Sequence, residues 1–137
     1  MASDLFRISK MKKKETRTAT ITLLEPGIVK VKFKPEIKLE KEDILANIKA
    51  SVDLTGGKHC ALLEIPNNAG ISDDALLFAG SRENAEYRIA NAIVFKATSV
   101  KLLWNFFNMF FKPTVNNKVF RNDAEALKWL RGFRYDT

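Results

Sequence analysis

The stretch CALLEI, Cys60–Ile65, decides the fold of this 137-residue chain. It is an almost continuous apolar run with the length of a strand. Such runs are typical of strands that are covered on both faces, as in parallel sheets flanked by helices. A second run of this kind, Ala92–Phe95 (AIVF), follows later in the chain. Two such strands predict an α/β domain.

An antiparallel hairpin is predicted ahead of Cys60–Ile65. Residues Thr18–Leu24 alternate polar and apolar side chains, and the turn residues Pro26 and Gly27 follow them. The next segment alternates Val29, Val31 and Phe33 with Lys30, Lys32 and Lys34. We expect one face of this strand to be buried and the lysines to face solvent or to protect a sheet edge.

Helices are predicted between and after the strands. Residues 40–54 have helical periodicity, and Gly56-Gly57 ends that helix. One side of it carries the apolar residues Ile44, Leu45, Ile48 and Val52. Ser72 is expected to N-cap a second helix, with Asp73 and Asp74 in its first turn. Ser81 is expected to cap a short helix near residues 82–88.

The segment Val100–Phe111 (VKLLWNFFNMFF) is unusually apolar, because nine of its twelve residues are large and apolar. It is too short to span a bilayer, and we expect a helix over residues 99–112 that ends before Pro113. Its apolar side chains form two stripes, of which one is expected to pack on the sheet. The second stripe consists of Leu102, Phe106, Met109 and Phe110.

This second stripe is a predicted interaction surface. Aromatic residues and Met are enriched in interface cores, which favours contact with another protein or with a second copy of this chain. Binding of a lipid, a small apolar ligand or an anionic membrane surface through the same helix is the alternative. Burial of both stripes within the monomer is a third interpretation.

The C-terminal part supplies a short strand at residues 118–120 and a last helix. Asn122 and Glu125 have the spacing of a capping box, and the helix is expected to bury Leu127, Leu130 and Trp129. The whole order is a hairpin followed by four strand–helix units, which predicts a mixed, mostly parallel sheet packed with helices. Residues 18–137 are expected to form one domain.

The net charge of +7 is concentrated near the N-terminus. Residues 1–17 carry six basic and two acidic side chains, a net of +4, and the remainder carries +3. We interpret residues 1–17 as a basic arm or a lead-in to the first strand. Phe6 is the one aromatic residue of this segment, and no aromatic residues interleave with its basic residues to stack on bases, which argues against nucleic-acid binding.

Several segments resemble the STAS-like, or SpoIIAA-like, group of bacterial domains, which is loosely linked to the lipid-binding SEC14 domain. They are residues 56–59 (GGKH) before 61–65 (ALLEI), residues 105–107 (NFF), Lys112-Pro113, and residues 119–130 (VFRNDAEALKWL). The resemblance covers the chain from about residue 18. It implies a STAS/SpoIIAA-like fold, and members of the group generally have no established activity.

In regulated STAS proteins a phosphorylated Ser or Thr follows the buried strand, inside an Asp-Ser-Ser-Gly-like turn. Only Ser72 has a comparable place here, and that motif is missing. Phosphate at Ser72 would meet the helix N-terminus favourably, but it would also meet the like charges of Asp73 and Asp74. Ser72 is therefore a candidate regulatory phosphosite, with a plain N-cap as the favoured interpretation.

No catalytic constellation is recognisable in the sequence. His59 is the single histidine, and Cys60 is the single cysteine and reads as a small core residue. Glu64, Asp73 and Asp74 follow a buried strand, where open α/β sheets bind ligands, but nothing pairs them into an acid–base couple. We expect no enzyme, no cofactor and no metal site. The expectation is a regulatory, cytoplasmic, protein-binding module that self-associates through residues 99–112.

Overall fold

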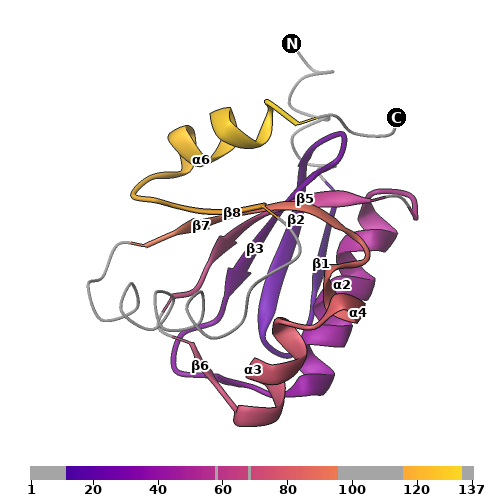
Figure 1. Cartoon of the computed structure of the whole chain (residues 1–137), viewed down its shortest axis with the longest axis vertical. Helices are drawn as coiled ribbons and strands as arrows, with labels where there is room; N and C mark the ends of the chain where they lie inside the picture. Colours follow the sequence, from indigo (N-terminus) through magenta and orange to yellow (C-terminus); the bar gives the residue numbers. More distant parts are fainter. Residues whose placement is uncertain (1–11, 58, 68, 96–115, 134–137) are drawn as a thin grey trace.

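The computed structural model describes residues 12–57, 59–67, 69–95 and 116–133 (Figure 1). The predicted helix over residues 99–112 lies outside them. The strands are β1 (Lys13–Glu15), β2 (Ala19–Glu25), β3 (Ile28–Phe33), β4 (Lys38–Leu39), β5 (Cys60–Ile65), β6 (Gly70–Ile71), β7 (Arg88–Val94) and β8 (Asn116–Phe120). The helices are α2 (Lys41–Leu54), α3 (Asp73–Ala79), α4 (Arg82–Ala85) and α6 (Asp123–Leu130).

Six strands form one mixed sheet in the order β1-β2-β3-β5-β7-β8. β1 and β3 both run antiparallel to β2, whereas β3, β5, β7 and β8 run parallel to one another. Gly27 in the turn between β2 and β3 has a φ of 84°, which a residue without a Cβ adopts readily. The predicted hairpin and mostly parallel sheet are therefore confirmed. β1 extends the sheet into the basic segment that precedes residue 18.

Helices cover both faces of the sheet (Figure 1), with α2, α3 and α4 on one face and α6 on the other. Within β5, Cys60 and Leu62 belong to the core beneath α2, whereas Ala61 and Leu63 belong to the core beneath α6. β5 is thus covered on both faces, as its composition predicts. No helix in the described part of the chain is long and apolar enough to cross a membrane.

The lysine-bearing face of β3 is only partly open to solvent. Val29, Val31 and Phe33 are buried under α2 as predicted, but Ile28 on the other face is also buried, with 1% of its surface exposed. On that same face, Lys30 Nζ lies 2.9 Å from Asp123 Oδ2 of α6. The expectation that all three lysines face solvent or protect an edge is therefore wrong for Lys30, because α6 packs over this part of the sheet.

Some predicted boundaries are wrong. β7 begins at Arg88 rather than Ala92, and α4 ends at Ala85 rather than near Arg88. The start of β7 was not predicted because the polar side chains of Arg88 and Asn91 interrupt the apolar pattern there. The segment 66–71, read as a loop, contains β6, which pairs in parallel with β4 in a separate two-stranded sheet.

The face of α2 that packs against the sheet is largely polar and is not the side that carries Ile44, Leu45 and Ile48. Its buried residues are Asp43, Asn47, Ala50, Ser51 and Leu54, whereas 43% of Leu45 is exposed. Polar partners before β2 explain this orientation. Asn47 Nδ2 donates to Thr18 Oγ1 at 3.0 Å, and Thr16 Oγ1 donates to Asn47 Oδ1 at 2.6 Å.

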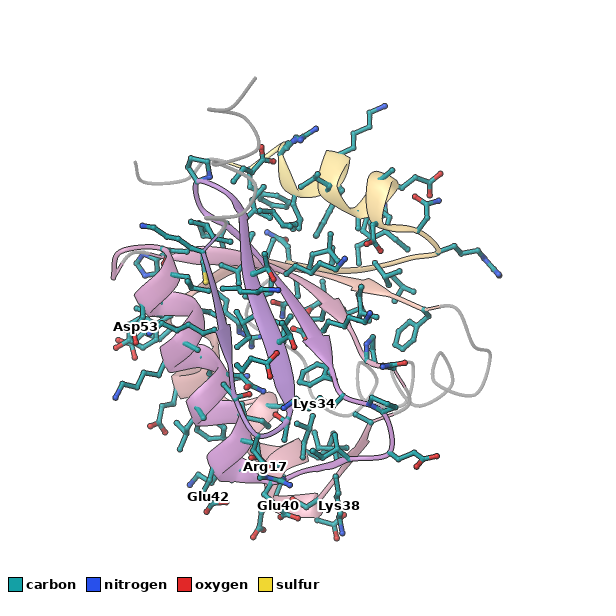
Figure 2. All side chains as sticks on the ribbon, turned by 180° about the vertical axis from the view of Figure 1, so that it is seen from behind. Arg17, Lys34, Lys38, Glu40, Glu42 and Asp53 are labelled. Carbon is teal, nitrogen blue, oxygen red and sulfur yellow. The ribbon has the colours of Figure 1, made fainter. Side chains whose placement is uncertain are left out.

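An arginine fixes the N-terminal end of α2. Arg17 Nε donates to Asp43 Oδ1 at 3.0 Å, and Arg17 Nη2 donates to both Asp43 Oδ2 and the Lys38 carbonyl. Asp43 Oδ2 also accepts from the backbone N–H of Glu40 at 2.8 Å. Figure 2 shows Arg17 at the end of α2 where Glu40 and Glu42 lie, far from Asp53 at the opposite end. The hydrogen bond from Arg17 keeps the pKa of Asp43 below its ordinary value.

We expect Asp43→Ala to lower the free energy of unfolding at pH 7 by about 1–3 kcal/mol, because it removes a helix cap and a bidentate arginine partner. Since the pKa of Asp43 is lowered, its contribution is present above its unfolded-state pKa and is lost as the pH falls through the folded value. Urea unfolding at pH 7 and at pH 3 measures both effects.

The matched control is Asp53→Ala on the same helix. Asp53 Oδ2 pairs with Lys14 Nζ at 3.2 Å, and both side chains are about half exposed. An exposed pair of this kind contributes less than about 1 kcal/mol. Equal losses in the two variants would contradict the role given to Asp43.

Candidate functional site

A pocket of about 120 Å³ lies between the sheet and the helices α2 and α3. Its apolar wall combines side chains from β3, β5, α2 and α3, including Val31, Leu62, Ile44, Ile48 and Leu76. The orientation of α2 explains why apolar side chains of this helix line the pocket. Because the polar side of α2 packs against the sheet, Ile44 and Ile48 are left on the side that faces the pocket.

One side of the pocket is polar. Neighbouring strands and α4 contribute its side chains, which are Glu64 from β5, Arg88 and Asn91 from β7, Asn117 from β8 and Asn84 from α4. The register of the parallel strands places Asn91 beside Asn117. Arg88 pairs with Cys60, whereas Glu64 pairs with Ile93, so the polar residues are spread along one side of the pocket. Residues far apart in the sequence therefore form this polar side beneath α2.

Arg88 is held in place by its neighbours. Its Nε donates to the Asn84 carbonyl at 3.1 Å. With the Asn91 amide oriented so that its oxygen faces the guanidinium, Asn91 Oδ1 accepts from Arg88 Nη1 and Asn91 Nδ2 donates to the Ala90 carbonyl at 3.2 Å. Asn84 is itself fixed, because its Nδ2 donates to the Ala79 carbonyl at 2.7 Å. The guanidinium is thus positioned before any ligand arrives.

In the described structure, the carboxyl of Glu64 is not held by hydrogen bonds in the way that the Arg88 guanidinium is. Only 8% of its surface is exposed, it lines the pocket, and no hydrogen bond joins its carboxyl to the described residues. Burial raises the pKa of Glu64, and attraction to Arg88 offsets part of that rise. Burial likewise lowers the pKa of Arg88. The two groups attract each other, yet they form no direct ion pair within the described structure.

The carboxylates considered from the sequence do not gather at one site. Glu64 lies in the pocket, whereas Asp73 and Asp74 are exposed in the first turn of α3 and do not line it. Sequence reasoning missed Arg88, Asn91, Asn84 and Asn117. The available signal was the polar residues that precede the apolar run of β7, but a single sequence gives no register between strands.

Cys60 is a buried core residue, whereas His59 is exposed beside Tyr87. Cys60 is 1% exposed, and burial raises the pKa of its thiol to about 11, so the thiol is neutral near pH 7. The His59 ring lies 6.5 Å from the Tyr87 ring, centroid to centroid. Among residues 12–57, 59–67, 69–95 and 116–133, no cluster of His, Cys, Asp and Glu could hold a metal ion.

Ser72 N-caps α3. Its Oγ accepts from the Ala75 N–H at 3.2 Å, and Asp73 and Asp74 occupy the first turn, as predicted. The phosphosite at Ser72 stays a prediction. The interaction residues Leu102, Phe106, Met109 and Phe110 lie outside the described residues, so the protein interface also stays a prediction.

We expect Ser72→Ala to lower the free energy of unfolding by about 1 kcal/mol, because the Ala75 N–H loses its partner at the start of a short helix. Thermal or urea unfolding measures the loss. Mass spectrometry of the protein from its native cells tests the other role, and a phosphate on Ser72 would contradict the plain N-cap interpretation.

We expect Glu64→Gln to raise the free energy of unfolding at pH 7, because the cost of burying the ionised carboxyl exceeds its attraction to Arg88. The pKa of Glu64 is raised, so native stability falls as the pH increases from its unfolded-state pKa through the folded one. The advantage of Gln should therefore vanish near pH 4. Urea unfolding at both pH values measures it.

Glu86→Gln is the control for this measurement, because Glu86 is exposed at the end of α4. A surface change of this kind alters stability by less than about 0.5 kcal/mol. If Glu64→Gln destabilised the protein at pH 7, the proposed cost of the buried carboxylate would be wrong.

Comparisons with known proteins agree with this architecture. A solved structure of an uncharacterised DUF3478-family protein with a SpoIIAA-like fold, from Shewanella loihica PV-4, is 18% identical and superposes with a TM-score of 0.52. The match covers 88% of this chain and 92% of that chain, and it confirms the SpoIIAA-like fold inferred from the sequence. No curated protein matches the chain significantly. Residues 22–134 match the family described as a domain of unknown function, DUF7793, and the chain therefore belongs to that family.

Proposed function

We propose that this protein is a non-enzymatic, cytoplasmic binding module for a small, largely apolar organic molecule, which it holds in the pocket beneath α2. The observation that carries the proposal is the buried, unpartnered carboxyl of Glu64 in a pocket whose other walls are mostly apolar. Ligand sites commonly combine an apolar lining with a few fixed polar groups that orient the ligand.

The size of the pocket limits the ligand. An engineered apolar cavity of about 150 Å³ accommodates benzene, so a pocket of about 120 Å³ suits a body of roughly six atoms other than hydrogen. A ligand this small has few contacts to offer, and its dissociation constant should lie in the micromolar to millimolar range.

Binding without catalysis is supported by the state of the polar side chains around the pocket. Ser51 Oγ donates to the Asn47 carbonyl within its own helix, at 2.8 Å, and no histidine lies beside it among the described lining residues. An activated nucleophile needs a base within hydrogen-bonding reach. Glu64 and Arg88 are the two charged residues of the described lining, and neither is paired with a nucleophile.

The protein interface predicted for residues 99–112 is a separate proposal. If another chain contacts this predicted interface (Leu102, Phe106, Met109 and Phe110), the protein would be an interaction module, and the ligand in the pocket would regulate that interaction. The pocket proposal does not depend on this contact, because its argument uses described residues alone.

Toluene, titrated into ¹⁵N-labelled protein, tests whether the pocket accepts an apolar body. We expect saturable shifts of the amide resonances of Leu62, Leu76 and Asn91, which surround the pocket. Ala79→Leu should weaken binding at least about tenfold, because Ala79 lines the pocket and the larger side chain would fill it. The same substitution at exposed Ala46 of α2 is the matched control and should change nothing.

The proposal fails if the wild-type protein shows no saturable shift with toluene or with its polar analogues. It also fails if the shifts persist unchanged in Ala79→Leu, because the ligand would then bind elsewhere.

A further inference from the structure

We propose that the pocket selects an uncharged head group in which an N–H or O–H donor lies beside a C=O acceptor, with a primary amide as the simplest case. This inference rests on the proposed function and adds the chemical class of the ligand. It is carried by Glu64 and Arg88, which come from neighbouring strands and face the same pocket.

Charge balance is the first argument. Glu64 and Arg88 are the charged residues of the described lining, and their formal charges cancel when Glu64 is ionised. Arginine remains protonated at any ordinary pH, so the carboxylate is the group that balances it. A charged ligand would leave one net charge in a site whose acid is largely buried, which is unfavourable. An uncharged ligand keeps the balance.

The inventory of donors and acceptors is the second argument. An ionised carboxyl only accepts hydrogen bonds, and Glu64 receives none from the described residues. Arg88 has five N–H donors, of which Nε serves the Asn84 carbonyl and Nη1 the Asn91 side chain. The buried Asn84 Oδ1 in the same lining also lacks a donor among the described residues. Of the charged pair, Glu64 lacks one donor and Arg88 offers one. A head group with one donor and one acceptor matches both.

The placement of the two groups is the third argument. Glu64 and Arg88 attract each other but make no direct ion pair within the described structure. Hydrogen bonds to Asn84 and Asn91 restrain Arg88 from moving toward the acid. A small head group can thus bridge the two, donating to Glu64 and accepting from Arg88, while its apolar body lies against Ile44 and Ile48.

Four probes with one ring test the head group, namely benzamide, benzoate, benzylammonium and toluene. Dissociation constants at pH 7 come from amide-shift titrations or calorimetry. We expect benzamide to bind at least about tenfold more tightly than each of the other three, because it alone fits both the charge balance and the hydrogen bonds.

Two variants should change the preference in opposite directions. Glu64→Gln leaves Arg88 without its counter-charge, so the ratio of benzoate to benzamide affinity should rise at least about tenfold. Arg88→Gln leaves Glu64 unbalanced, so the ratio of benzylammonium to benzamide affinity should rise instead. Glu86→Gln removes an exposed carboxylate outside the pocket and should leave all the ratios unchanged.

The outcomes separate the two proposals. If toluene binds in the pocket but benzamide gains nothing over benzoate, the head-group inference is overturned and the proposed function stands. If no probe binds, both are overturned. Should Arg88→Gln fail to fold, the Glu64→Gln ratio decides alone, and an unchanged ratio in that variant contradicts the inference.

Discussion

The position of β5 in the middle of the sheet is the constraint on which the rest of the structure depends. Its residues pair with parallel strands on both sides, and its side chains enter two different cores. Polar side chains on such a strand lose most of their contact with bulk water. Glu64 is the one ionisable carboxyl on β5, and it points to the side of the sheet where the pocket lies. The position of Glu64 in the fold therefore determines how deeply its carboxyl is buried.

The way in which α2 packs turns this constraint into a site. Arg17 fixes the first turn of the helix through Asp43, and Asn47 binds the threonines before β2. These polar contacts rotate the helix so that its apolar residues Ile44 and Ile48 are only half buried and face the pocket. Had the apolar side packed fully on the sheet, the pocket would be filled by helix side chains. The polar contacts of α2 and the opening of the pocket are thus two results of one orientation.

Much of the fold could be predicted from the sequence, and most of the site could not. Cys60–Ile65 indicated a buried strand, and Ser72 and Asn122 marked helix starts, because composition and capping are local signals. Arg88 and Asn91 were missed for the opposite reason: they break the apolar pattern, so β7 was shortened at the residues that form the polar side of the pocket. Whether these residues reach the pocket depends on the register between β5, β7 and β8, and residue spacing along a single sequence does not determine that register.

Burying the charged side chains of Glu64 and Arg88 costs free energy, so their presence in the pocket needs an explanation. Apolar side chains of similar volume in place of a buried acid and base are often neutral or stabilising. Arg88 contributes hydrogen bonds to Asn84 and Asn91, but Glu64 contributes none within the described structure. A carboxyl that adds no contact to the fold is therefore best understood through what enters the pocket. Arg88 lowers the cost of ionising Glu64, and the same balance of charges disfavours a charged ligand. The feature that makes the buried acid tolerable is thus also the one from which we infer the selectivity of the pocket.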